Sequence, residues 1–125
     1  MFIKTFIMKC TWDKLINRNE HDQYPRSYDD DVAYKIHKKI VNEFFTLEEY
    51  CHLLYIDPFE ATTLVRNKFP YESNLEHYLL WIKPHYHVDV NYILKQSFNQ
   101  FIAFKNIPTM RSIHTLSHYQ VFVKL

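Results

Sequence analysis

Apolar residues recur at every fourth position in one segment of the first half of the chain: Val32, Ile36, Ile40 and Phe44. This spacing predicts an amphipathic helix over about Tyr28–Phe44 with one apolar stripe. Ser27 precedes it as a favourable N-cap, and its charges run from acidic in the first turn to basic further along, which suits the helix dipole. His37 lies off the stripe, so we expect its side chain to be solvated.

Two further helix starts follow in the polar and apolar pattern. The segment Thr46–Glu49 has the pattern of a capping box, which predicts a second, short helix with Leu47, Cys51 and Leu54 on its inner face. An acid before proline, with Glu60 two residues after Pro58, predicts the start of a third helix at Asp57. We therefore expect a helical first half over about residues 12–68.

After Phe69-Pro70-Tyr71 the pattern changes to short runs of aromatic and branched residues. Three such runs predict strands: Glu76–Lys83, Gln100–Lys105 and His118–Lys124. Asp89 is placed to cap a helix between the first two. The second half, about residues 69–125, then reads β-α-β-β, and the whole chain of 1–125 reads as a single α+β domain with N-terminal helices packed on a small antiparallel sheet.

One connection in the second half is unusually long. Asn106–Ser117 is about a dozen residues between two strands that we expect to pair, whereas a hairpin needs only two to five. Long loops in small domains often carry function, so this loop is the first place to search for a site.

The chain has 125 residues and no glycine. Phosphate-binding loops, dinucleotide-binding turns, nucleophile elbows and EF-hand loops need glycine, because backbone must approach a ligand closely or adopt positive φ. These classes of site are therefore excluded, and any anion site must be built from side chains. Without glycine, we expect Asn42 and Asn67 to take the left-handed conformation near the ends of two predicted helices.

The net charge is only +1, from 15 basic and 14 acidic residues. This balance supports binding neither to nucleic acid nor to an anionic membrane, and no apolar run approaches the length of a membrane span. The sequence shows no signal peptide, and Cys10 and Cys51 share no motif spacing, so we expect buried, reduced thiols in a cytoplasmic protein. The many Asn, Lys, Ile, Tyr and Phe residues are typical of an AT-rich genome; if that genome is viral, the compartment is the host cytoplasm or the virion.

The eight histidines suggest metal pairs, which we weigh against ordinary roles. His85 and His87 are spaced for one strand face, but Pro84 interrupts the segment; His114 and His118 are spaced for a helix, but we expect them to cross from loop into strand. The acidic run 29–31 is explained by the helix dipole. We expect no metal and no cofactor.

His77 and His118 are stronger candidates, because each lies at or near the start of a predicted strand and antiparallel pairing would bring them into one cleft. There they would act as acid and base, while nearby cations and polar groups would hold a small anionic ligand such as a sugar phosphate or nucleotide. The ligand-binding candidates are Lys83, Asn106, Arg111, Ser112 and Arg18. The alternative is that both histidines satisfy buried backbone groups, and that Arg18 is an ordinary surface charge or salt bridge.

Three segments in order resemble an uncharacterised domain family that includes the fungal N-acetylglucosamine-induced protein. The matching residues are Trp12, Asp13, Leu15 and Arg18, then Phe69, Pro70, Tyr71, His77 and Trp81, and finally Phe104, Asn106, Ser112, His118, Val121, Phe122 and Val123. The chain departs from the family pattern at Gln120, where the family has a second histidine, at Arg111, where it has lysine, and at Pro108, which is displaced by one position. The resemblance implies a shared fold and no particular activity.

Two functional hypotheses follow. The first is a binding protein or enzyme for a small anionic ligand. The second is a non-catalytic interaction or structural protein, for instance of a virus with an AT-rich genome, whose aromatic surface binds a partner. Exposed edge strands leave a homodimer open in either case.

Overall fold

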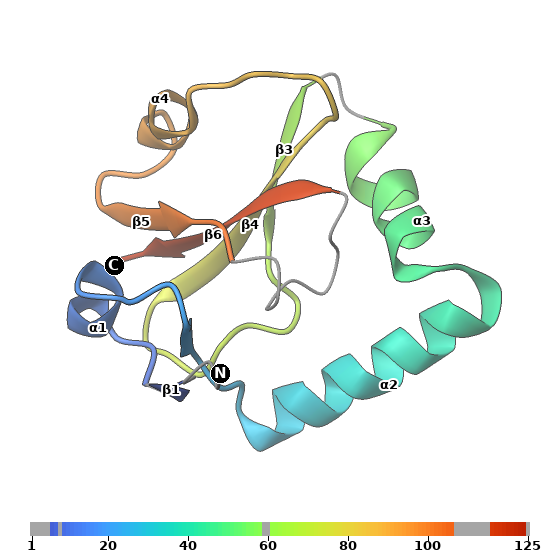
Figure 1. Cartoon of the computed structure of the whole chain (residues 1–125), viewed down its shortest axis with the longest axis horizontal. Coiled ribbons are helices and arrows are strands. Elements are labelled where there is room, and N and C mark those ends of the chain that lie inside the picture. Colours follow the sequence, from blue (N-terminus) through green and yellow to red (C-terminus); the bar gives the residue numbers. More distant parts are fainter. Residues whose placement is uncertain (1–5, 8, 59–60, 107–115, 125) are drawn as a thin grey trace, which may run out of the picture.

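A four-stranded antiparallel sheet forms the centre of the protein, in the order β3-β4-β6-β5 (Figure 1). Its strands are β3 (Thr62–Arg66), β4 (Glu76–Ile82), β5 (Phe101–Phe104) and β6 (Ser117–Val123). This computed structural model describes residues 6–7, 9–58, 61–106 and 116–124. The α+β class is confirmed, and the three strands expected in the second half form within one or two residues of their predicted ends.

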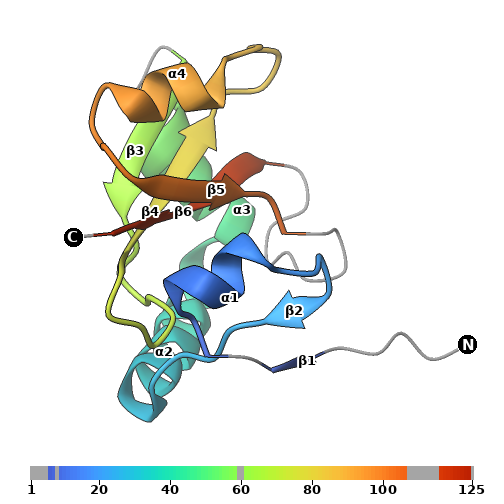
Figure 2. The same ribbon diagram turned by 90° about the vertical axis from the view of Figure 1, so that its left-hand side faces the viewer.

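One face of the sheet is covered by α4 (Val90–Lys95), which lies above the sheet in Figure 2. The Asp89 side chain caps this helix by accepting a hydrogen bond from the backbone N–H of Tyr92, as its position in the sequence predicts. Leu94 packs against Leu80 and Val121, all three fully buried. This layer is an ordinary apolar core.

The opposite face carries the N-terminal helices α1 (Trp12–Ile16), α2 (Tyr28–Phe44) and α3 (Leu47–Cys51), followed by the π-helix η1 (His52–Ile56). A short parallel pair, β1 (Phe6–Ile7) with β2 (Asp22–Gln23), lies beside α1. Buried side chains on this face form two separate clusters. One cluster, near α1, is Cys10, Leu15, Tyr24, Phe104 and Phe122; the other, near α3 and η1, is Cys51, Ile56, Trp81 and Leu116.

Helix α2 has the predicted bounds and its predicted cap, since the Ser27 hydroxyl accepts from the backbone N–H of Asp30. Its orientation differs from what an amphipathic pattern normally implies. The buried residue is Val41, whereas Ile36 and Ile40 are each 54% exposed. His37 is half-buried and packs against aromatic rings, so the expectation that it is solvated is wrong.

The second predicted helix forms as α3, and both hydrogen bonds of its capping box are present. Leu47 and Cys51 face inward as predicted, but Leu54 is exposed and Ile56 is buried in its place. The reason is that the chain continues from Cys51 as a π-helix, whose i to i+5 hydrogen bonding brings the fifth residue onward, rather than the third, onto the inner face.

The third predicted helix is wrong. Residues 59–60 lie outside the described residues, and residues 62–66 form strand β3, where two threonines and a valine favour extended backbone. The helical half therefore ends at Ile56 rather than near residue 68. The expected left-handed asparagines are also absent: Asn42 lies inside α2 and Asn67 follows β3. Among the described residues it is His85, with φ 72°, that takes the positive-φ conformation.

Candidate functional site

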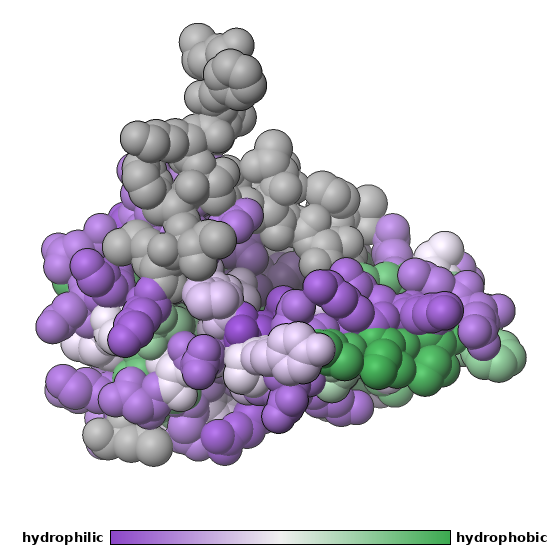
Figure 3. Space-filling model, turned by 90° about the horizontal axis from the view of Figure 1, so that it is seen from below, coloured by the Kyte–Doolittle hydropathy of each residue, from purple (hydrophilic) through white to green (hydrophobic). Residues whose placement is uncertain are grey.

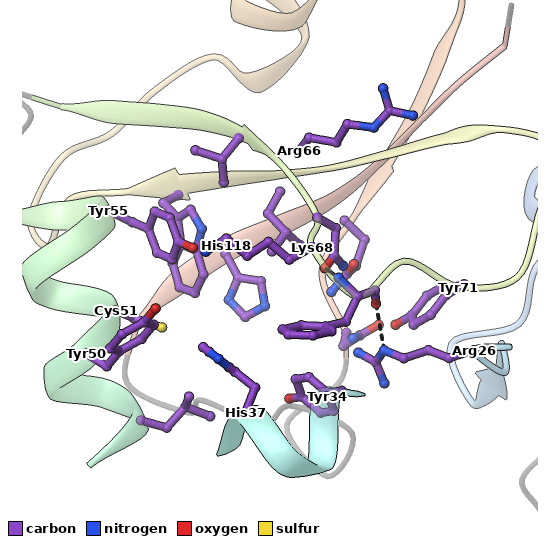
Figure 4. Close-up of a pocket in the computed structure, with 18 residues that line it drawn as sticks. Arg26, Tyr34, His37, Tyr50, Cys51, Tyr55, Arg66, Lys68, Tyr71 and His118 are labelled. Atoms are coloured by element: carbon purple, nitrogen blue, oxygen red, sulfur yellow. Dashed lines mark hydrogen bonds between the residues drawn. The ribbon is translucent and has the colours of Figure 1, made fainter. Parts of the chain in front are cut away.

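A cavity of about 190 Å³ lies on the helical face of the sheet, against α2 and α3 (Figure 4). Its walls come from the sheet strands β3, β4 and β6, from α2, α3 and η1, and from the connection between β3 and β4. Its lining includes Cys51 and Trp81 of the cluster near α3 and η1, and Tyr71, which packs against the cluster near α1. The cavity therefore lies between the two buried clusters.

The wall formed by α3, η1 and the sheet is aromatic. Tyr55 stacks on Trp81 with ring centres 5.3 Å apart and an angle of 8° between the planes, and Trp81 stacks in turn on His118 at 4.6 Å. Tyr50 and Cys51 lie on the same side of the cavity in Figure 4. This wall is suited to the face of a flat or ring-shaped molecule.

Arg26 lies on the opposite side of the cavity and is held in place by two kinds of contact (Figure 4). Its Nε donates to the backbone carbonyl of Phe69 at 2.7 Å, and its guanidinium carbon lies 4.1 Å from the centre of the Tyr34 ring. No carboxylate of the described residues pairs with it. The terminal nitrogens of a guanidinium fixed in this way form a rigid fork that matches a phosphate or carboxylate.

Two more cations line the cavity, with different surroundings. Arg66 forms an ion pair with Glu76 at 2.7 Å, so its charge is largely neutralised. Lys68, in contrast, has no carboxylate partner in the described part of the chain. Burial, and to a lesser degree the positive charge of Lys68 nearby, lower the pKa of His37.

The remaining polar lining is neutral, and the described lining residues include no aspartate or glutamate. The indole Nε1–H of Trp81 is buried and has no acceptor among the described residues. Buried donors in native structures nearly always have a partner, so an acceptor from outside the described residues is expected there.

His77 lies outside the cavity lining and has a structural role. It is 2% exposed, and its ring packs against those of Tyr71 and Phe122, which also contact each other. Its Nδ1 accepts from the backbone N–H of Tyr71, so the proton is on Nε2, which donates to Oε1 of Gln120. Burial lowers the pKa of His77 to about 4, and the ring is neutral near pH 7. His77 therefore fastens the β3–β4 connection, which carries Phe69 and Asn67, to the sheet.

The expectation that His77 and His118 are neighbours is wrong. In the register of β4 and β6, His77 pairs with Phe122 and His118 pairs with Trp81, four positions further along β4. At ~3.4 Å per residue, the two histidines are roughly 14 Å apart along the strand. His118 does line the cavity, so one member of the predicted pair belongs to it.

The predicted ligand-binding residues are divided in the same way. Asn106 lines the cavity and its side chain is hydrogen-bonded to Tyr71. Lys83 follows the far end of β4 and is not in the lining, and the guanidinium of Arg18 packs 3.7 Å from the centre of the Phe104 ring. Arg111 and Ser112 lie outside the described residues, as does most of the long loop that we singled out.

Sequence reasoning missed Arg26, Lys68 and His37. The available signal was the position of Asn67 and Lys68 directly before Phe69-Pro70-Tyr71, a segment that we used to mark the change of pattern and as part of the resemblance. Nothing in the sequence places Arg26 next to Phe69, because the two are 43 positions apart and meet only in the folded chain.

The cysteines do not contribute reactive groups. Cys10 and Cys51 are buried free thiols, as expected, and burial raises their pKa values to about 11 and about 12. No group of three or more His, Cys, Asp or Glu side chains in the described ranges is arranged to hold a metal ion. No helix in those ranges is long and apolar enough to cross a membrane.

Comparison with known proteins identifies the fold and nothing further. No protein-family model and no curated protein matches the chain. A solved structure, the crystal structure of HTC1, is similar with a TM-score of 0.58 and 18% sequence identity, covering 82% of this chain and 76% of that one. At this level of identity the likeness supports the α+β fold alone.

Proposed function

We propose that the protein binds a small anionic ligand in the cavity between α2 and the sheet. The observation that carries this proposal is the charge of the lining: Arg26 and Lys68 have no carboxylate partner among the described residues, and none of the described lining residues is acidic. The chain as a whole is almost neutral, so this local excess of positive charge is not a consequence of composition.

The two walls suit two parts of one ligand. On one side, Arg26 offers the terminal nitrogens of its fork and Lys68 adds a point charge, which together match a phosphate or carboxylate group. On the other, the partly exposed rings of Tyr50, Tyr55 and His118, the last two stacked on the buried Trp81, offer an aromatic surface. The ligand class is therefore a small phosphate ester or carboxylate that carries a ring.

The size of the cavity favours a small member of this class. Drug-sized ligands occupy pockets of roughly 300 to 1,000 Å³, whereas this cavity measures about 190 Å³. A sugar phosphate or a single mononucleotide is a better fit than a dinucleotide. His77 is buried and is not in the cavity lining. The proposal is therefore for ligand binding, and it does not include His77 and His118 as an acid and base pair.

The test is a thermal-shift series with inorganic phosphate, ribose 5-phosphate, AMP and adenosine. A ligand of the proposed class at 100 times its dissociation constant stabilises the protein by ~2.7 kcal/mol. We expect stabilisation by at least one phosphate ester and none by adenosine. If none of the anions raises the melting temperature, the proposal is wrong.

A matched pair of variants locates the binding. Lys68 is exposed and unpaired with acid among the described residues, so Lys68→Gln should preserve the fold and weaken the anion by about fivefold, the effect of ~1 kcal/mol. Lys95→Gln, on α4 across the sheet, is the control and should leave binding unchanged. Equal effects of both changes would indicate non-specific attraction instead of a site.

A further inference from the structure

The apolar stripe of α2 faces away from the protein. Ile36 and Ile40 are each 54% exposed and Phe44 is 75% exposed. Figure 3, which views the molecule from the side of α2, shows a continuous apolar band on this surface. Apolar residues scattered singly on a surface are normal, but a contiguous stripe on a soluble domain marks an interaction site.

The interior of the chain does not need this stripe. The inward side of α2 is supplied by other residues: Val41 is buried, and Tyr34 and His37 line the cavity. Rotating the helix to bury Ile36 and Ile40 would remove these three contacts. The outward orientation is therefore fixed by the inner face, and the stripe is left for a partner.

We propose that a second copy of this chain packs on the stripe, with its α2 antiparallel to the first. The four-residue spacing is self-complementary about a twofold axis at the level of residue 38: Ile36 faces the partner's Ile40, and Val32 faces the partner's Phe44. The same patch is then used on both copies, as a twofold dimer requires. The small Val32 also makes room for the partner's larger Phe44.

The charges along α2 favour the antiparallel orientation. A parallel pair would place the acidic first turn, Asp29 to Asp31, against its own copy. In the antiparallel pair, Lys35 lies only ~3 Å along the axis from the partner's Glu43, at a rise of 1.5 Å per residue, and on the same edge of the interface. Lys35 already pairs with Asp31 at the exposed surface, an arrangement that contributes little and can be exchanged.

The area is of the size that a dimer uses. Aromatic side chains bury roughly 150 to 250 Å² each, so Phe44 and Tyr28, which is 82% exposed at the start of α2, together with the two isoleucines offer on the order of 500 Å² per protomer. With a polar rim, such a patch reaches the ~800 Å² per partner of a standard interface. The proposal is independent of the ligand, because the cavity lies on the other side of α2.

The first test is the mass of the protein by analytical ultracentrifugation from low to high micromolar concentration. We expect a concentration-dependent dimer. Ile36→Glu places two charges against apolar surface at symmetric points, and should raise the dimer dissociation constant by at least about tenfold. The control is Ile16→Glu on α1, which changes an isoleucine of similar exposure, 58%, outside the stripe and should leave the dimer intact.

A cross-linking experiment tests the orientation. The variants Ile36→Cys and Ile40→Cys are oxidised separately and as a mixture; antiparallel packing predicts that the mixture forms the disulfide dimer far more readily than either alone, whereas parallel packing predicts the reverse. Circular dichroism checks that every variant is folded. A wild-type protein that stays monomeric, a dimer insensitive to Ile36→Glu, or faster cross-linking of the separate variants would each overturn the proposal, the first being the result if the stripe binds a different protein.

Discussion

The buried imidazole of His77 should make the stability of the protein depend on pH in a defined window. In the folded chain its pKa is lowered to about 4 by burial, against 6.5 for the exposed side chain. Below pH 6.5 the unfolded chain therefore binds a proton that the folded chain does not, and stability falls as the pH drops toward 4. At ~1.36 kcal/mol per pKa unit, the loss at pH 4.5 is about 2.5 kcal/mol from this residue.

The measurement is urea unfolding of the wild type and of His77→Asn, each near pH 7.5 and near pH 4.5. Asparagine keeps an acceptor for the backbone N–H of Tyr71 and removes the titrating group. Every other ionisable group is the same in the two proteins, so its contribution cancels in the comparison. We expect the wild type to lose about 2.5 kcal/mol more than the variant between the two pH values. Parallel losses would refute the assignment of His77 as a buried neutral group.

Three further predictions concern the fold. In the π-helix, Ile56→Ala should destabilise by about 2 to 4 kcal/mol and Leu54→Ala by less than about 0.5 kcal/mol in urea unfolding, the reverse of what a continuous α-helix implies. Thr46→Ala removes the capping box of α3 and should lower the free energy of unfolding by ~1 kcal/mol. His85→Gly should raise the melting temperature, because glycine relieves a positive φ that costs ~1 kcal/mol for other residues. An unchanged or lower melting temperature would show that the His85 side chain makes compensating contacts.

Local chemistry in the sequence was sufficient to predict most elements. Ser27, Thr46 and Asp89 each cap the helix that they were expected to cap, because capping depends only on residues within three positions. Short runs of aromatic and branched residues also located the strands of the second half. The failure at β3 has a physical cause: an acid followed by proline favours a helix start, yet the next residues are β-branched, and pairing with β4 decides the outcome.

The direction in which a helix faces was not predictable in the same way. The stripe of α2 is a true periodic signal, but periodicity gives one apolar side and does not say whether it is covered by the same chain or by another. The inner side of the helix contains Tyr34, His37 and Val41, a mixed set that does not form an apolar stripe in sequence. Such a set suits the proposed ligand cavity, so the proposed site and a simple amphipathic pattern place opposite demands on this helix.

The absence of glycine explains why the site takes the form that it does. Without glycine the chain has no ready-made backbone cradle for an anion, and the cations must be held by side-chain contacts instead. Arg26 shows how this is achieved: its Nε is hydrogen-bonded to the Phe69 carbonyl and its plane packs on Tyr34. The loop that carries Phe69 is itself fixed through Tyr71 to the buried His77. The histidine that sequence reasoning placed among the catalytic groups thus positions the connection that holds the arginine, which links the pH-dependent stability of the protein to the geometry of the proposed anion site.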